Sequence, residues 1–309
     1  MGCDIAAWCA LNGMQVSLQD REQEYIDPAF KRAAHLFSKR IRDANDRAAA
    51  SDRLVSDVEG RGVAGADLLI EAIFENEDAK QALYTKLQAD MKAGAILATN
   101  TSSIRLENLR TVLDEPRRFV GLHFFNPVAQ LPLVEVIRCE DTDQAALDVA
   151  FAFVKAIGKF PIECKSAPGF VVNRLLGPYM AEAMYLAEAG IPLAAIDAAA
   201  ERFGMPMGPI ELIDSVGLDV AMHVSTVLSE AFDRPVPNTL PGLVEAGRLG
   251  RKSGHGFYQW EAGKAVKPDI NGTETPSNMT DRLILPLVNE AVACLSEGIV
   301  RDADLLDAG

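Results

Sequence analysis

Hydrophobic and polar residues along the first half of the chain follow two different periods, one typical of helices and one typical of strands. Apolar residues at helical spacing predict helices over residues 1–11, 28–50 (one long helix or a helix pair), 78–91 and 142–157. Short alternating or continuous apolar runs predict strands over residues 14–18, 66–74, 95–98 and 159–164. Helices and strands that alternate in this way are typical of a doubly wound α/β sheet.

Residues 118–136 contain two apolar, β-prone runs on either side of a turn-like centre rich in proline. If this stretch folds as a hairpin, His123 and Glu135 lie opposite each other, because each is six residues from Ala129. Their Cβ atoms would then be about 5 Å apart. A carboxylate against an imidazole fixes its tautomer and stabilises its protonated form, as a general base requires. Such pairs also occur in purely structural roles, so the spacing alone leaves both interpretations open.

The first twenty residues show helix, tight glycine turn, strand and terminal acid, the second part of a dinucleotide-binding βαβ unit. Gly2 would be the last glycine of a G-x-G-x-x-G loop whose first strand we expect to be missing. Asp20 follows 18 residues after Gly2, near the spacing of an acid that contacts the adenosine ribose. An acid there repels a 2′-phosphate, which favours NAD over NADP. A helix end at Gly13 and a strand end at Asp20 would explain the same residues without a ligand.

Polar residues follow the two continuous apolar runs where each predicted strand ends. Glu75 follows the first run, and Asn100 and Ser102 follow the second. Ligands of open α/β sheets bind outside the carboxyl ends of the strands, so these side chains are expected at one rim beside His123. Turn formation also explains small hydroxyl residues in loops, and their clustering at this rim adds weight to a ligand site.

A second, mainly helical domain is predicted from Ser166, because the following Pro168 and Gly169 form a break with a helix-start signature. Helical spacing predicts helices near residues 170–189, 193–203 and 209–229, followed by a glycine-rich closing loop over 250–260 and a polar linker over 261–278. The predicted domains are an NAD-binding domain (1–165), a helical substrate and dimer-type domain (166–260) and a linker with a partial second helical domain (261–309).

The second half of the chain repeats itself after 108 positions. Residues 173–178 align with residues 281–286, and the same offset pairs Gly190 with Gly298. Two helices with a proline at the same place and the same exit turn predict a duplicated helical domain, of which the chain holds only the start of the second copy.

Composition narrows the class of protein. Hydrophobic residues make up 49% of the 309 residues and charged residues 24%, which is typical of a globular protein with room for two domains. The net charge of −14 argues against a general binder of nucleic acids or anionic membranes. The five cysteines show no CxxC and no metal-like spacing, so reduced thiols, a cytoplasmic location and no metal site are expected. No stretch reaches the ~18 uninterrupted apolar residues of a membrane span.

With these motifs in place, the chain resembles the L-3-hydroxyacyl-CoA dehydrogenase family. It is most similar to the dehydrogenase region of the bacterial multifunctional fatty-acid oxidation α subunits, in which two helical domains stand in tandem. The resemblance rests on residues 1–20, 71–76, 100–103, 123–135, 168–174, 206–212 and 250–258. It implies a Rossmann-type α/β domain followed by an all-α domain, NAD as cofactor, and 3-hydroxyacyl-CoA as substrate in fatty-acid β-oxidation. It also suggests a thiolase subunit as partner.

The resemblance implies catalytic roles at four positions. His123 would be the catalytic base and Glu135 its partner, and Ser102 and Asn173 would contact the reacting oxygen of the substrate. The residue that aligns with Asn173 in the second copy is Asp281, so no catalytic role is carried into that copy.

The resemblance also implies which residues hold the cofactor. Asp20, Glu75, Lys80 and Asn100 would contact NAD, and Gly2 is the glycine of the nucleotide loop that the chain retains.

Two alternatives stay open in the sequence. The first is another NAD-dependent hydroxy-acid dehydrogenase on the same two-domain plan, and those that use a lysine base do not require the His123–Glu135 pair. The second is an inactive truncated fragment, because a sheet without its central first strand has unpaired strand edges.

Overall fold

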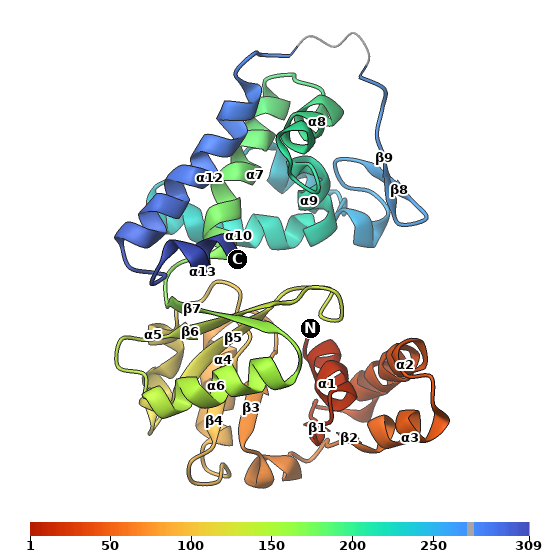
Figure 1. The fold of residues 1–309 in the computed structure, drawn as a ribbon, viewed down its shortest axis with the longest axis vertical. Coiled ribbons are helices and arrows are strands. Elements are labelled where there is room, and N and C mark those ends of the chain that lie inside the picture. The colour runs from red at the N-terminus through yellow and green to blue at the C-terminus, as the bar shows by residue number, and fades with distance from the viewer. Residues whose placement is uncertain (271–274, 309) are drawn as a thin grey trace. The chain divides into compact units, whose positions relative to one another are not determined.

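The computed structural model describes residues 1–270 and 275–308, and the chain divides into two compact units (Figure 1). Unit 1 contains Met1–Ser166 together with the chain end from Asp307, and unit 2 contains Ala167–Leu306. Residues 271–274 of the predicted polar linker lie outside the described residues. Unit 1 is an α/β domain and unit 2 is mainly helical, which confirms the predicted fold class.

The strands that the structure describes in unit 1 form two sheets. β1 (Val16–Leu18) and β2 (Leu54–Ser56) pair in parallel. The larger sheet has the order β3-β4-β5-β6-β7, with strands at Leu68–Glu71, Ile96–Thr99, Phe119–Phe124, Leu133–Arg138 and Phe160–Lys165. All neighbouring strands in it are parallel except β5 and β6. This mostly parallel sheet is the Rossmann-like arrangement that the alternation of helices and strands predicts.

The helices of unit 1 lie close to the predicted positions, except for a short helix at residues 106–109 that was not predicted. They are α1 (Gly2–Leu11), α2 (Gln23–Arg40), α3 (Ala44–Asp52), α4 (Glu77–Leu87), α5 (Leu106–Leu109) and α6 (Gln144–Ala156). The stretch predicted as one long helix or a pair is a pair, because the chain is extended at Ile41 and Asp43 caps α3 by accepting hydrogen bonds from the amides of Asn45 and Asp46.

The larger sheet packs against α6 to form the core that carries β5 and β6 (Figure 1). The apolar residues of α6 recur at helical spacing, and Leu147, Ala150 and Val154 are buried against the sheet. Full burial of a side chain such as Leu147 stabilises the fold by roughly 1.5–3 kcal/mol. This core fixes the two strands that hold His123 and Glu135.

The predicted hairpin is confirmed with its predicted register. β5 and β6 are antiparallel, and His123 pairs directly with Glu135. Two steps away, Gly121 pairs with Ile137, and a Cβ atom at Gly121 would lie 2.7 Å from the Ile137 side chain. Only glycine therefore fits opposite Ile137 without a shift of the strands.

The strand predicted over residues 66–74 is shorter than expected. β3 ends at Glu71, whose carboxylate accepts a hydrogen bond from the amide of Ile73 at 2.7 Å and turns the chain out of the sheet. The exposed fraction of Phe74 is 69%, so the end of this apolar run lies at the surface. β2 was not predicted from the sequence.

Unit 2 consists mainly of helices around one apolar core. They are α7 (Val172–Glu188), α8 (Leu193–Phe203), α9 (Pro209–Val216), α10 (Leu218–Phe232), α11 (Thr239–Glu245) and α12 (Met279–Ser296), and α13 (Ala303–Ala308) follows at the chain end. α11 was not predicted. The short hairpin of β8 (Gln259–Glu261) and β9 (Lys264–Val266) replaces the start of the predicted linker, because Ala262 and Gly263 both adopt positive φ in a two-residue turn.

The single helix predicted over residues 209–229 is also wrong. Gly217 has a φ of +105° and separates α9 from α10, so the two helices meet at a bend of 104°. Among the described residues no single helix is both long and apolar enough to cross a membrane; α9 and α10 meet the length and composition test only together, across this bend.

The repeat predicted from the sequence has a structural counterpart in α7 and α12. The two helices contain Pro178 and Pro286, and both exit turns contain a glycine of positive φ, Gly190 and Gly298. α12 packs along α7 inside unit 2, which continues beyond residue 260. The expected boundary at 261 therefore does not separate two compact units.

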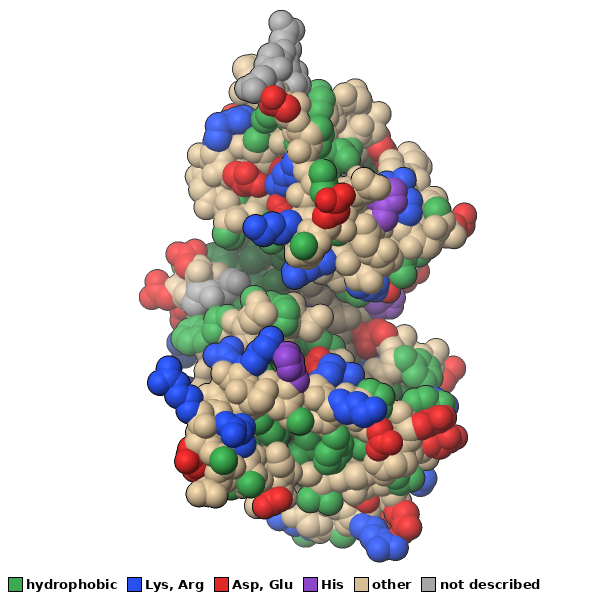
Figure 2. Space-filling model, turned by 90° about the vertical axis from the view of Figure 1, so that its right-hand side faces the viewer, with side chains coloured by type: hydrophobic (Ala, Val, Ile, Leu, Met, Phe, Trp, Pro, Cys, Tyr) green, Lys and Arg blue, Asp and Glu red, His purple; other side chains and the backbone are tan. Residues whose placement is uncertain are grey.

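Acidic and basic side chains are mixed on the surface despite the net charge of −14. On the face drawn in Figure 2, Lys and Arg side chains lie among Asp and Glu side chains in both units. Some form exposed ion pairs, such as Arg32 with Asp4. Each such pair contributes at most about 1 kcal/mol to stability.

Candidate active site

His123 and Glu135 form a close, buried pair on the β5–β6 hairpin. The distance from His123 Nδ1 to Glu135 Oε2 is 2.6 Å, and the Glu135 side chain has no exposed surface. The ring of Phe125 lies beside the imidazole, with ring centres 4.5 Å apart. The register of the hairpin, set by alternating side chains on two short strands, is what brings these two residues together.

This contact decides which ring nitrogen can act as a base. An ionised carboxylate only accepts hydrogen bonds, so Nδ1 carries the proton that it donates to Glu135. Nε2 is then the nitrogen that can take a proton from a substrate. The same carboxylate would stabilise a positive charge on the ring if the ring took up such a proton.

Asn100 joins the end of β4 to the end of β5. Its side-chain oxygen accepts a hydrogen bond from the backbone amide of Phe124 at 2.9 Å. The backbone amide of Asn100 donates to the carbonyl of Glu71 at 2.8 Å. These contacts place Asn100 at the carboxyl ends of three neighbouring parallel strands, next to His123, as the sequence predicts.

Glu75 organises the turn that contains Ser102. One oxygen of its carboxylate, Oε1, accepts hydrogen bonds from the Thr101 hydroxyl at 2.5 Å and from the amides of Ser102 at 2.8 Å and Ser103 at 3.2 Å. Burial of Glu75 acts to raise the pKa of its carboxyl, but the hydrogen bonds from Thr101 and Ser102 and the charge of Lys80 outweigh it and lower the pKa. Glu75 is therefore held as a carboxylate that fixes the Ser102 turn.

Lys80 is fully buried, although the sequence predicts that it contacts NAD. It has no exposed surface, and its Nζ lies 2.7 Å from Glu71 Oε1 and 3.4 Å from Glu75 Oε2. In this arrangement Lys80 supports Glu75 from behind, so a direct contact with NAD needs a local rearrangement and stays a prediction.

Glu71 is the residue of this region that sequence reasoning missed. Its buried carboxylate accepts hydrogen bonds from Lys80 at 2.7 Å, Tyr84 at 2.6 Å and Thr99 at 2.8 Å, and so links α4 to β3 and β4. Burial and the neighbouring Glu71 charge raise the pKa of the Tyr84 hydroxyl, which keeps it a donor. An acid inside an otherwise apolar strand was the signal in the sequence.

Gly2 and Asp20 flank the first helix and strand as expected. Gly2 begins α1, where an added Cβ would lie 3.2 Å from the Cβ of Ala72, so the glycine lets the helix start approach the end of β3. Asp20 is exposed after β1, and its carboxylate accepts a hydrogen bond from the amide of Arg21 at 2.7 Å.

Asn173, the remaining predicted site residue, lies in unit 2. It is in the first turn of α7, directly before the buried Arg174. His123, Glu135, Ser102, Asn100 and Glu75 all belong to unit 1.

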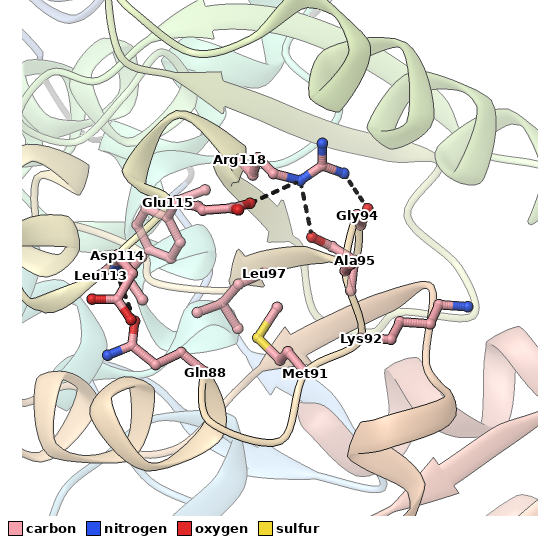
Figure 3. A pocket seen from close by; sticks show the side chains of 12 residues that line it. Gln88, Met91, Lys92, Gly94, Ala95, Leu97, Leu113, Asp114, Glu115 and Arg118 are labelled. Carbon is pink, nitrogen blue, oxygen red and sulfur yellow. Dashed lines mark hydrogen bonds and ion pairs between the residues drawn. The ribbon is translucent and has the colours of Figure 1, made fainter.

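A cavity of about 190 Å³ lies at the amino ends of the strands of the large sheet (Figure 3). It is lined by residues at the amino ends of β4 and β5, including Leu97 and Arg118, and Arg118 donates to the carbonyls of Gly94 and Ala95. His123 and Asn100 lie at the opposite, carboxyl ends of these strands. This cavity is smaller than the 300–1,000 Å³ typical of ligand pockets, and it lies away from the candidate site residues at the carboxyl ends of the strands.

Among residues 1–270 and 275–308, no group of three His, Cys, Asp or Glu side chains is placed to hold a metal ion.

Comparison with known proteins matches both units to one family. Residues 1–167 match the 3-hydroxyacyl-CoA dehydrogenase NAD binding domain, and residues 169–260 match the C-terminal domain of the same family. The chain belongs to the 3-hydroxyacyl-CoA dehydrogenase family. Unit 1 therefore corresponds to the NAD binding domain of this family.

Relatives of this dehydrogenase family include enzymes from several bacteria. The fatty acid oxidation complex subunit alpha of Ectopseudomonas oleovorans is 35% identical over all of this chain, which spans 47% of that relative. The structure of 3-hydroxybutyryl-CoA dehydrogenase from Escherichia coli matches 98% of this chain and 84% of its own, at 26% identity and a TM-score of 0.84. (S)-3-Hydroxybutyryl-CoA dehydrogenase PaaH1 from Ralstonia eutropha matches 84% and 95%, at 34% identity and a TM-score of 0.77. The chain thus spans about half the length of the curated relatives that it matches.

Proposed function

We propose that this chain oxidises (3S)-3-hydroxyacyl-CoA to 3-oxoacyl-CoA with NAD, using His123 as the general base and Glu135 as its partner. The observation that carries the proposal is the buried His123–Glu135 contact of 2.6 Å at the carboxyl ends of the parallel strands. Membership of the 3-hydroxyacyl-CoA dehydrogenase family supports the substrate class and the cofactor.

The proposed step moves a hydride from carbon and a proton from oxygen. NAD, when bound, accepts the hydride. His123 Nε2 takes the proton from the substrate hydroxyl, and Glu135 stabilises the imidazolium that results. Histidine suits this role because imidazole can take up and release a proton under near-neutral conditions. Ser102 and Asn173 hydrogen-bond the substrate oxygen as it changes from hydroxyl to carbonyl.

The residues present in unit 1 fit NAD. The glycine at position 2 allows a close approach at the start of α1, where backbone amides favour phosphate oxygens. The exposed carboxylate of Asp20 suits ribose hydroxyls and disfavours a 2′-phosphate. Asn100 and Glu75 lie at the rim where the nicotinamide end would reach His123, and Lys80 supports Glu75.

The lysine-base alternative has less support. Lys80 is the lysine beside this rim, and it is fully buried in ion pairs with Glu71 and Glu75. A base must reach the substrate proton, so an enclosed and paired lysine is unsuited to the role. His123 on β5 remains the better candidate for the base.

The wider setting of this proposal follows from the relatives. We place the reaction in fatty-acid β-oxidation in the cytoplasm, and a thiolase subunit is the partner that would consume the 3-oxoacyl-CoA product. The curated relatives are named as subunits of a fatty acid oxidation complex, which supports assembly with a partner.

The direct test is the rate of NADH formation from (3S)-3-hydroxybutyryl-CoA by the purified chain, with the (3R) enantiomer as a matched control. We expect turnover of the (3S) substrate and at most a trace with (3R). A folded chain that binds NAD and turns over neither enantiomer would contradict the proposal, and turnover of both would contradict its stereochemistry.

A further inference from the structure

Arg174, the residue after Asn173, is held by an unusually complete set of contacts. Its guanidinium forms a two-pronged ion pair with Glu297, with Nη1 and Nη2 each 2.7 Å from one carboxylate oxygen, and its Nε lies 2.6 Å from Glu290 Oε1. The ring of Phe232 covers the guanidinium at 4.6 Å. We call Arg174, Glu290 and Glu297 the Arg174 clamp. Paired prongs of this kind fix orientation as well as charge.

The two acids of the Arg174 clamp come from the far end of unit 2. Glu290 lies on α12, and Glu297 caps the carboxyl end of that helix. Both lie beyond residues 169–260, which match the C-terminal domain of the family. The clamp therefore joins Arg174, the residue after Asn173, to a segment outside the matched domain.

The clamp is one half of a symmetric arrangement that the sequence repeat creates. Arg174 and Glu182 on α7 correspond to Arg282 and Glu290 on α12, 108 positions later. Arg174 pairs with Glu290, and Arg282 Nε pairs with Glu182 at 2.7 Å. The two ion pairs are the same contact made in both directions between antiparallel copies of one helix.

The two symmetry-related contacts differ in burial and in completeness. The Arg174 and Glu290 side chains are 3% and 4% exposed, whereas Arg282 is 41% exposed. Arg174 alone has the second acid, Glu297, whose repeat counterpart is Ala189. The stronger contact is therefore the one next to Asn173, and the weaker one is next to Asp281.

Both ends of the clamp stay charged at working pH. Burial of Arg174 acts to lower the pKa of its guanidinium, but the hydrogen bonds that it donates to Glu297 and Glu290 outweigh burial and raise the pKa. The hydrogen bond from Arg174 lowers the pKa of the Glu297 carboxyl. Both directions favour the charged forms that the ion pair of Arg174 with Glu297 requires.

The start of α7 needs such an anchor. Gly169 and Phe170 enter the helix with φ of +72° and +52°, and the Arg174 amide donates to the carbonyl of Gly169, five residues earlier. First-turn residues lack the full set of helical hydrogen bonds, so their positions depend on other contacts. Asn173 lies in this turn, directly before the clamped residue.

We infer that the Arg174 clamp positions Asn173 for catalysis, so that α12 is part of the construction of the active site. The inference rests on the proposed function, which gives Asn173 its contact with the reacting oxygen. Arg174, Glu290 and Glu297 are positioning residues, since they act through Asn173.

The test compares the paired variant Glu290→Gln/Glu297→Gln with Glu182→Gln, which breaks the symmetry-related ion pair. Each is made in the native chain and in an Asn173→Ala chain. We expect the paired variant to lower kcat by roughly 10- to 100-fold with KM for NAD unchanged, since small displacements of a positioned group have effects of this size. Glu182→Gln is expected to keep the native kcat.

The decisive measurement is the effect of the paired variant on kcat in the Asn173→Ala chain. If the clamp acts through Asn173, the paired variant causes no further loss of kcat there. Equal losses in both backgrounds, a native kcat in the folded paired variant, or the same loss from Glu182→Gln would overturn the inference. If the paired variant does not fold, Glu297→Gln alone serves, because Glu297 is half exposed. A native kcat for Asn173→Ala would instead refute the role that the proposed function gives Asn173.

Discussion

At the scale of single residues, the proposed chemistry depends on the contact between His123 and Glu135. The sequence predicts this contact because a hairpin centred on Ala129 places the two residues opposite each other, and the observed register agrees. A local, two-stranded feature with a period of two can be read from the chain without knowing the rest of the fold.

Glu135→Gln tests the charge of that contact without changing its shape. The substitution removes the negative charge that would stabilise the imidazolium, so we expect kcat to fall roughly 10- to 1,000-fold while the fold is kept. Glu163→Gln on the neighbouring strand β7 is the matched control and should keep the native rate. Unfolding of Glu135→Gln, or an unchanged rate, would make Glu135 a structural residue only.

Other single-residue contacts were beyond the reach of the sequence. Glu75 was predicted to contact NAD, and the structure shows its carboxylate holding the turn of residues 101–103, which are 26 to 28 positions away in the chain. The contact between Glu71 on β3 and Tyr84 on α4 likewise joins separate elements inside the domain. Contacts between distant segments depend on how strands and helices stack, which no local pattern records.

At the scale of elements, the predicted periods give most helices and strands, and two of the errors occur at glycines. The prediction of one helix over residues 209–229 did not allow for Gly217, whose positive φ separates α9 from α10. The β8–β9 hairpin was not predicted, although Gly263 supplied a turn signal.

Substitution of Gly217 by alanine tests this bend. The native φ of +105° is strained for alanine, and the new Cβ would lie 3.0 Å from an oxygen of Asp219. We expect the free energy of unfolding to fall by about 1–3 kcal/mol in urea denaturation. Gly242→Ala is the matched control, since this glycine is in α11 with nothing within 4 Å of an added Cβ. Its stability should rise by about 0.4–1 kcal/mol, and equal effects at both sites would refute the account of the bend.

At the scale of the whole molecule, the fold class follows from the order of elements, and the family follows from motifs spread over both units. The packing of α12 on α7 is harder to predict. The repeat shows that the two helices are alike, but only the structure shows that they pair with each other and place Glu290 and Glu297 on Arg174.

The choice between NAD and NADP is a property of unit 1 as a whole. It can be measured as the increase in the free energy of unfolding that each cofactor causes. NAD at 100 times its Kd should raise the free energy of unfolding by about 2.7 kcal/mol, seen as slower hydrogen exchange in β3, β4 and β5. NADP at the same concentration should protect less, because Asp20 repels the 2′-phosphate. Asp20→Ala should reduce this difference, and equal protection by both cofactors in the native chain would contradict the role of Asp20.

The most direct test of the central claim is the rate of NADH formation by His123→Gln, beside His35→Gln as a matched control on the exposed face of α2. Loss of a general base typically lowers kcat by roughly 10²- to 10⁴-fold. We expect a loss of this size for His123→Gln, with NAD affinity unchanged, and a native rate for His35→Gln. A near-native rate for a folded His123→Gln would show that the proton is taken by another group.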